Sequence, residues 1–491
     1  MEKETQVQEK RYVGPKEIFL YGVANGGQVF GYNIVSMQLS FFFTMVFGIP
    51  SAAVAVMVFV LGIWDAFNDP IMGGLIDRTR TRYGKLRPWL LIVPIPLSIT
   101  TILLFSGPVI LQDVKTTAIK IVYMYISYII WEFFYTIGDV PFWGLSAAIS
   151  PSTRDRTNAI TSARFISGII GGLASPLLSV MIDLSNNGVI GWDLKEVFCF
   201  MGILAGAMIL LLFSLAGTKC RERVVQSEER PNLFQSFANM FKNRPLLMII
   251  LSNVLGTVTR IADVFNTYFY IFVLDLASYS IIIGIPGTIT GFLGYGLVPI
   301  LKRKFSNRQI IALCTFSKAA ISVIVFLIGM NYYDKAAVVV PLLMLQGAVN
   351  SLFTSVTMVV PTEMIGDTVD YMEWKTGKRN EGTNFAVLTF VSKLTGSLST
   401  SLSAAILPLI GIIVPSDGTD PYLNGAGVNT SFWLWGLITA IPPVIGLVQL
   451  IPYIFYDLQG KKLEKIHSDM RIRREELAQS ATARAGKEGE E

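Results

Sequence analysis

Two carboxylates and an amide lie close together in a strongly apolar segment. Asp65 and Asp69 are four residues apart and Asn68 follows Asp65 by three, so a helix would place all three on one side. Carboxylate and amide oxygens suit a hard cation, and a bound Na⁺ or a proton would relieve the repulsion between the two acids. The pattern predicts a cation site. The alternative is an ion pair with the basic loop at residues 78–87, but Asp65 lies three turns from that loop.

A second polar group occurs in a later apolar segment. Thr136, Asp139 and Trp143 are spaced by three and four residues, which places them on one helix face. A carboxylate accepts hydrogen bonds from hydroxyl groups while an indole covers the C–H face of a sugar ring, so Asp139 and Trp143 are candidate sugar ligands. A packed Trp and an Asp paired with a neighbouring helix would give the same pattern.

Basic side chains also occur inside long hydrophobic blocks. Arg164 and Lys393 stand where a charge costs about 2.5–3.5 kcal/mol on insertion scales, so each needs a partner or a water-filled cavity. Their positive charges can balance the negative charges of the acids described above, and this charge balance can couple the binding of one ligand to the binding of another. Arg260 and Asp263 are three residues apart and can neutralise each other, whereas Glu132 fits either the centre or the edge of a span.

The segments that hold these side chains are long and apolar. Hydrophobic residues make up 52% of the 491 residues and charged residues 15%, with a mean hydropathy of +0.53, whereas soluble domains carry about 25% charged residues. Twelve blocks approach the ~20 residues that a bilayer-crossing helix needs, which predicts an all-α membrane protein with twelve transmembrane helices. The predicted spans are residues 18–47, 52–76, 89–110, 118–148, 159–182, 197–216, 246–273, 278–301, 309–330, 336–360, 383–414 and 431–455.

The loops between these spans alternate in charge. One set is rich in bases and the other is short and poor in them, so the positive-inside rule predicts a multi-pass cell-membrane protein with both termini in the cytoplasm. The net charge of +5 is then explained by the basic loops that orient the protein in the membrane, and we expect no nucleic-acid partner. The basic set comprises residues 10–16, 78–87, 154–156, 219–230, 302–308 and 375–379.

A polar stretch at residues 217–244 separates six predicted spans from six more. The Gly-rich and basic residues that end the second span, residues 73–78, are weakly echoed at residues 294–304, which end the eighth. Two six-helix bundles with related loops are the layout of a major facilitator carrier. The predicted parts are an N-terminal bundle (1–217), a cytoplasmic middle loop (218–245), a C-terminal bundle (246–456) and a charged cytoplasmic tail (457–491).

The residue types that carry most enzyme chemistry are sparse. Cys199, Cys220 and Cys314 are scattered without pairing or ligand spacing, and the single histidine, His467, lies in the polar tail. The sequence shows no nucleophile–base pair and no phosphate-binding loop. We therefore expect a protein that is not an enzyme and has no cofactor.

Several motifs together resemble the glycoside-pentoside-hexuronide:cation symporters, the melibiose permease-like family of the major facilitator superfamily. The resemblance extends from about residue 21 to the twelfth predicted span. The motifs that carry it are residues 65–73, 80–89, 135–143, 154–156, 163–165 and 366–375, with Lys393.

The resemblance implies a role for each matching residue. The cation site would comprise Asp65, Asn68, Asp69 and Thr136. The sugar site would comprise Asp139, Trp143 and Arg164, with Lys393 between the two sites. A cytoplasmic gate of ion pairs would comprise Arg156, Asp367, Asp370 and Arg379.

The first predicted span departs from the family pattern because it lacks the substrate-binding acid. Asn25 and Gln28 are polar candidates in its place, and Thr389 is one in the eleventh span. With fewer carboxylates to face Arg164 and Lys393, an acidic sugar such as a hexuronide or glucuronide is one expectation.

The sequence thus predicts a monomeric secondary transporter that carries a sugar or glycoside together with a monovalent cation across a lipid bilayer. Asn68 favours Na⁺, because an amide oxygen can ligate a metal ion, while protonation of either Asp leaves H⁺ open. Two alternatives are a carrier of an amphipathic or lipid-like solute and a transport-dead solute sensor, although a sensor has no need of a cation site.

Overall fold

The computed structural model describes residues 11–79, 81–150, 152–223, 243–376, 381–412, 429–466, 468–469 and 472. Within them, regular structure is helical apart from an isolated bridge between Thr81 and Gly84. Eight helical segments of this described part are long and apolar enough to cross a bilayer, or nine if a bent pair counts as one span. The all-α membrane fold is thereby confirmed, while the count of twelve spans stays a prediction.

The chain divides into two compact units. Unit 1 takes residues 1–229, 263–281 and 397–434, and unit 2 takes residues 230–262, 282–396 and 435–491. Four helices contribute to both units: α12 (Ile261–Phe272), α13 (Tyr279–Lys302), α16 (Glu381–Ile406) and α17 (Thr430–Ile438). The boundaries between bundles, middle loop and tail that the sequence indicates near residues 217, 245 and 456 stay predictions.

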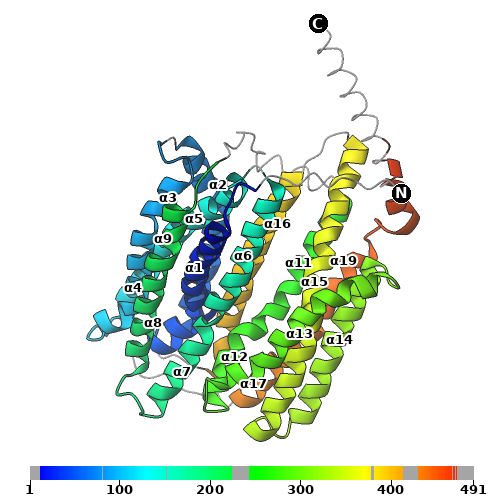
Figure 1. The fold of residues 1–491 in the computed structure, drawn as a ribbon. Coiled ribbons are helices and arrows are strands. Elements are labelled where there is room, and N and C mark those ends of the chain that lie inside the picture. Colours follow the sequence, from blue (N-terminus) through cyan, green and yellow to red (C-terminus); the bar gives the residue numbers. More distant parts are fainter. Residues whose placement is uncertain are drawn as a thin grey trace. The chain divides into compact units, whose positions relative to one another are not determined.

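Unit 1 holds the first helices of the chain (Figure 1), and in it α1 lies beside α6 and α4 beside α8. Two π-helical turns, η1 and η2, continue α1 and α8. The helices are α1 (Pro15–Phe41), η1 (Phe42–Val46), α2 (Ser51–Arg78), α3 (Arg87–Ile92), α4 (Pro94–Ile110), α5 (Thr117–Ala148), α6 (Thr153–Gly172), α7 (Ala174–Asn186), α8 (Leu194–Met208), η2 (Ile209–Phe213) and α9 (Ser214–Lys219).

Small residues let α1 pack closely on two neighbours. A Cβ at Gly26 would lie 2.7 Å from the Ile170 side chain of α6, and one at Gly27 would lie 2.6 Å from the Met208 carbonyl oxygen of α8. Within a bilayer, helices associate largely through such close van der Waals contact. The two glycines are adjacent, so α1 is held from two directions and its polar face has a fixed orientation.

Aromatic side chains fill the space around the π-turn at the end of α1. Phe42 is fully buried, and its ring centroid lies 4.9 Å from that of Phe105 on α4 and 5.3 Å from that of Phe198 on α8. Outside this core, exposed apolar residues recur every three or four positions on α4, as at Ile95 and Ile99. Such a stripe is typical of a face that contacts lipid.

Unit 2 has its own apolar core, in which buried residues such as Leu246, Val356 and Tyr453 pack together. Polar side chains also join its helices, because Gln346 donates to Ser322 (3.0 Å) and Ser252 donates to the Gln449 carbonyl (2.8 Å). The helices that lie wholly in unit 2 are α11 (Arg244–Gly256), η3 (Thr257–Arg260), α14 (Asn307–Gly329), α15 (Ala336–Thr376), α18 (Ile441–Gly446), η6 (Leu447–Gln449) and α19 (Leu450–Ile454), whereas the short η4 (Leu407–Ile410) belongs to unit 1.

Candidate functional site

One face of α5 carries three of the predicted site residues, Thr136, Asp139 and Trp143. Thr136 is 2% exposed, whereas Asp139 and Trp143 are half-buried. The helix runs without interruption through all three, so their spacing of three and four residues places them on one side, as predicted.

Gln28 of α1 reaches this face. Its amide nitrogen donates a 2.9 Å hydrogen bond to Asp139 Oδ1, and its side chain is 1% exposed. Gln28 Oε1 is buried and has no hydrogen-bond partner among the described residues. Asn25, the other polar candidate of this helix, donates to the backbone carbonyl of Ala163 (3.3 Å), so the structure gives it a contact between helices.

Tyr135 lies on α5 directly before Thr136 and packs against two other rings. Its ring stacks on that of Tyr32 of α1, with centroids 5.0 Å apart. It also stacks on the ring of Trp131, one turn earlier on α5, with centroids 5.3 Å apart. An aromatic contact therefore joins α1 to α5 beside the predicted site residues.

Glu132 is a further acid of α5 that the sequence alone left unplaced. It is 8% exposed and lies one turn before Thr136. Glu132 precedes Thr136 by four residues and Asp139 by seven, so an extension of the predicted face by one turn would have found it.

The predicted cation residues lie on α2. Asp65 is half-buried and Asn68 is fully buried. Neither amide atom of Asn68 has a hydrogen-bond partner among the described residues. Its amide oxygen is therefore a candidate cation ligand, and the next residue in the sequence is Asp69. Asp69 is part of α2, but its side chain lies outside the described part of the structure.

Trp143 and Arg164 meet between α5 and α6. The guanidinium carbon of Arg164 lies 4.4 Å from the centroid of the Trp143 ring, a cation–π arrangement. The predicted base and aromatic of the sugar site are therefore together. Arg164 is exposed, so its charge can reach a ligand.

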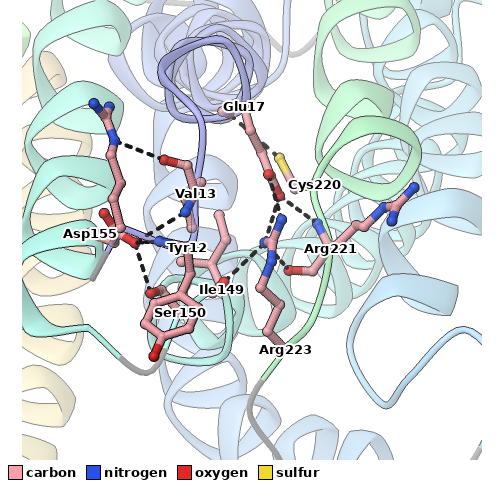
Figure 2. Close-up of polar contacts among 10 residues, drawn as sticks. Tyr12, Val13, Glu17, Ile149, Ser150, Asp155, Cys220, Arg221 and Arg223 are labelled. Atoms are coloured by element: carbon pink, nitrogen blue, oxygen red, sulfur yellow. Dashed lines mark hydrogen bonds and ion pairs between the residues drawn. The ribbon is translucent and has the colours of Figure 1, made fainter. Parts of the chain in front are cut away.

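One end of unit 1 is tied by Asp155 (Figure 2). Its Oδ2 accepts hydrogen bonds from the backbone N–H groups of Tyr12 (2.8 Å) and Val13 (3.1 Å) and from the Ser150 hydroxyl (2.9 Å). Burial alone would raise the pKa of Asp155, but these hydrogen bonds and the charge of Arg11 hold it below its ordinary value.

A second tie joins the start of α1 to the chain after α9. Arg223 makes a bidentate ion pair with Glu17, at 2.8 and 2.9 Å, and also donates to the Ile149 carbonyl (3.0 Å). Burial, followed by the charge of Glu17, raises the pKa of the neighbouring Cys220 thiol to about 12. Asp155 and Arg223 thus fix three separate chain segments at one end of unit 1.

The other predicted residues are placed less completely. Lys393 is half-buried on α16 of unit 2, and Thr389 belongs to the same helix, although its side chain lies outside the described part. Of the predicted gate, Arg156 belongs to unit 1, Asp367 and Asp370 lie on α15 of unit 2, and Arg379 lies outside the described residues. The gate therefore stays a prediction.

A helical membrane fold whose polar face combines acids, aromatic rings and an exposed base is typical of a solute carrier. Residues 20–460 match the family model described as MFS/sugar transport protein, so the chain belongs to that family. It is 27% identical to an isoprimeverose transporter of Lactiplantibacillus pentosus, over 94% of this chain and 91% of that one. It is 26% identical to a glucuronide carrier protein homolog of Escherichia coli (strain K12), over 91% and 93%.

One further relative is similar in sequence, and one solved structure is similar in fold. The chain is 29% identical to the uncharacterized symporter YjmB of Bacillus subtilis (strain 168), over 95% of this chain and 98% of the relative. Its fold resembles that of the nucleoside transporter NupG, with a TM-score of 0.57 over 90% of this chain and 98% of that one. That pair is 15% identical, so the likeness concerns the fold alone.

Proposed function

We propose that this protein is a secondary active transporter that carries a sugar or glycoside together with Na⁺ or H⁺. One observation carries the proposal. Thr136 of the predicted cation site and Asp139 of the predicted sugar site lie three residues apart on one face of α5. Two ligands that bind at these side chains would therefore feel each other's charge, which symport requires.

The coupling follows from charge neutralisation. A cation at Asp65, Asn68, Asp69 and Thr136 removes negative charge near Tyr135 and Asp139, and the sugar then binds Asp139, Trp143 and Arg164 more tightly. Linkage requires that the sugar raise the cation affinity by the same factor. Asn68 favours Na⁺, since its buried amide oxygen can ligate a metal ion and a proton has no need of it.

The relatives support a sugar substrate, since one is named for isoprimeverose and another for a glucuronide. The gate of Arg156, Asp367, Asp370 and Arg379 would close the cytoplasmic side while the two halves rock. In this proposal the protein acts as a monomer in the cell membrane, with both termini in the cytoplasm, and uses no cofactor and no chemical step.

The test is accumulation in proteoliposomes under an imposed Na⁺ or H⁺ gradient. Asp65→Asn and Asp69→Asn each remove a charge that the cation must balance, so we expect both to abolish gradient-driven accumulation of a labelled glycoside. Glu196→Gln, at the exposed start of α8, is the matched control and should accumulate normally. Normal accumulation in both aspartate variants would refute the proposed cation site.

An amphipathic solute is the second candidate. An apolar pocket of about 330 Å³ lies between α4 and α5, lined by residues that include Leu103, Tyr123 and Ile126. Its lining contains none of the predicted cation or sugar residues, so such a solute would move without the proposed coupling site. Uptake of a lipid-like probe that Asp65→Asn leaves unchanged would favour this candidate.

A further inference from the structure

The pocket between α4 and α5 opens on an apolar, exposed face of unit 1. Two of its lining residues on α5, Val122 and Ile126, are 56% and 55% exposed. The hydroxyl groups of Thr100, Tyr123 and Ser127 also line it, and each donates a hydrogen bond to a backbone carbonyl. Since these protons are already used, the pocket suits a hydrocarbon chain better than a sugar.

Tyr123 joins the two walls of the pocket. Its hydroxyl donates to the Leu103 carbonyl of α4 (2.5 Å), and a Cβ at Gly107 would lie 2.5 Å from its ring. Glycine at position 107 therefore lets the ring of α5 approach the backbone of α4 closely. The pocket is thus part of a defined contact between the two helices.

The pocket has the length of one bilayer leaflet. Its wall on α5 runs from Ile119 to Ile130, eleven residues further along an unbroken helix, which is about 16 Å. The hydrocarbon core of a bilayer is about 30 Å thick, so one leaflet contributes about 15 Å. An acyl chain of a single leaflet matches this length.

Two lysines lie at the end of the pocket where α5 begins. Lys115 is exposed in the turn between α4 and α5, and Lys120 precedes Tyr123 by three residues, on the same side of the helix. Neither lysine forms an ion pair within the part of the chain that the structure describes. Asp113 is the one acid of this turn, so two bases against one acid leave a positive charge, which attracts a lipid phosphate.

We propose that this pocket is a site for an anionic phospholipid, with one acyl chain between α4 and α5 and the phosphate at Lys115 and Lys120. The lipid is a bound partner that stabilises the packing of the two helices, and it is not the carried solute. The inference is independent of the proposed function, because the pocket shares no residue with the predicted cation and sugar sites.

Native mass spectrometry of the purified full chain measures this binding. Delipidated protein in a neutral detergent would be titrated with phosphatidylglycerol and with phosphatidylcholine of the same acyl chains. We expect one phosphatidylglycerol to bind at least fivefold more tightly than phosphatidylcholine. Lys115→Gln and Lys120→Gln should each weaken phosphatidylglycerol about fivefold and leave phosphatidylcholine unchanged.

A second variant tests the place of the acyl chain. Val122→Trp fills the pocket from an exposed position, so it should weaken both lipids about tenfold, as the loss of two buried methylene groups would. Ile95→Trp is the matched control, because Ile95 is 55% exposed on α4 and lies outside the lining. It should bind both lipids as the wild type does.

Three outcomes would overturn the lipid site. The first is equal binding of the two phospholipids by the wild type, and the second is phosphatidylglycerol binding that Val122→Trp leaves unchanged. The third is a dimer that Val122→Trp converts to a monomer, which would assign the pocket to a second copy of the chain. Each leaves the proposed symport intact, since gradient-driven glycoside accumulation is measured separately.

Discussion

At the scale of single residues, Asn68 is the side chain whose burial most needs an explanation. It is fully buried in α2, and both amide atoms lack a hydrogen-bond partner among the described residues. An unsatisfied buried polar group costs about 1–3 kcal/mol. In the proposed cation site, a bound cation would satisfy the amide oxygen and recover this cost.

This cost predicts the behaviour of Asn68→Leu. In the absence of the cation, the free energy of unfolding of the variant should be about 1–3 kcal/mol higher than that of the wild type, because the unsatisfied amide is gone. NaCl should raise the melting temperature of the wild type and leave that of Asn68→Leu unchanged, since a ligand stabilises only the state it binds. Thermal unfolding in NaCl and in KCl measures both effects.

Asn33→Leu is the matched control for that variant. Asn33 also lies in unit 1 and donates a 3.0 Å hydrogen bond to the Gly171 carbonyl. Its loss should lower stability but leave the response to NaCl as in the wild type. A NaCl response that persists in Asn68→Leu would remove Asn68 from the cation site.

Asp155 gives a prediction about pH. Its pKa is lowered in the folded protein, so the stability that it contributes is fully present above its ordinary pKa of about 3.9 and is lost as the pH falls through the folded value. Asp155→Asn should therefore melt at a lower temperature than the wild type at pH 7, and the gap should narrow on acidification below about pH 4. Melting curves of both proteins between pH 7 and pH 3 measure this, and a gap that stays constant would contradict it.

The residues of α5 show what the sequence could and could not predict. Spacing alone predicts that Thr136, Asp139 and Trp143 share a face, because an unbroken helix repeats every 3.6 residues. It cannot predict that Gln28 donates to Asp139, since that contact joins residues 111 positions apart and depends on how α1 packs. Glu132 was left open for a related reason, because its burial depends on the neighbouring helices rather than on its own spacing.

At the scale of elements, the orientation of α1 depends on glycines that face two helices. A Cβ at Gly27 would meet the Met208 carbonyl oxygen at 2.6 Å, and this oxygen belongs to a helix backbone that cannot rotate away. The π-turn η2 begins directly after Met208, so its wider backbone lies against α1. The same orientation of α1 lets Gln28 reach Asp139.

Gly27→Ala should therefore destabilise unit 1 and weaken binding together. We expect a loss of about 1–3 kcal/mol, as for other overpacked positions, and a lower glycoside affinity because Gln28 is displaced. Gly168→Ala is the control, since a Cβ there meets nothing within 4 Å. Melting temperature and glycoside titration of both variants measure the effect, and equal behaviour of the two would contradict it.

At the scale of the whole molecule, the proposed orientation places the loop after α2 inside the cell and the turn after α7 outside. Tyr83 is 46% exposed in the first and Val189 is 68% exposed in the second. A thiol-reactive label would therefore distinguish the two sides of the membrane if it were directed to a cysteine at either position. The native Cys220 would react little with such a label, because burial raises the pKa of its thiol to about 12 and keeps it protonated at neutral pH.

Labelling of intact cells tests this orientation. A membrane-impermeant maleimide should modify Val189→Cys directly, and Tyr83→Cys only after the membrane is permeabilised. The unsubstituted protein gives the background from its three native cysteines. Direct labelling of Tyr83→Cys in intact cells would invert the proposed topology.

The ties at the start of α1 also have a consequence for biogenesis. Glu17 bonds to Arg223, 206 residues later, and Tyr12 bonds to Asp155, 143 residues later. At about 5–20 residues per second, a ribosome needs about 10–40 seconds to pass from Glu17 to Arg223. The start of α1 therefore has neither contact until Asp155 is made and has only the Asp155 contact until Arg223 is made, so unit 1 is exposed to misassembly and proteolysis until both contacts can form.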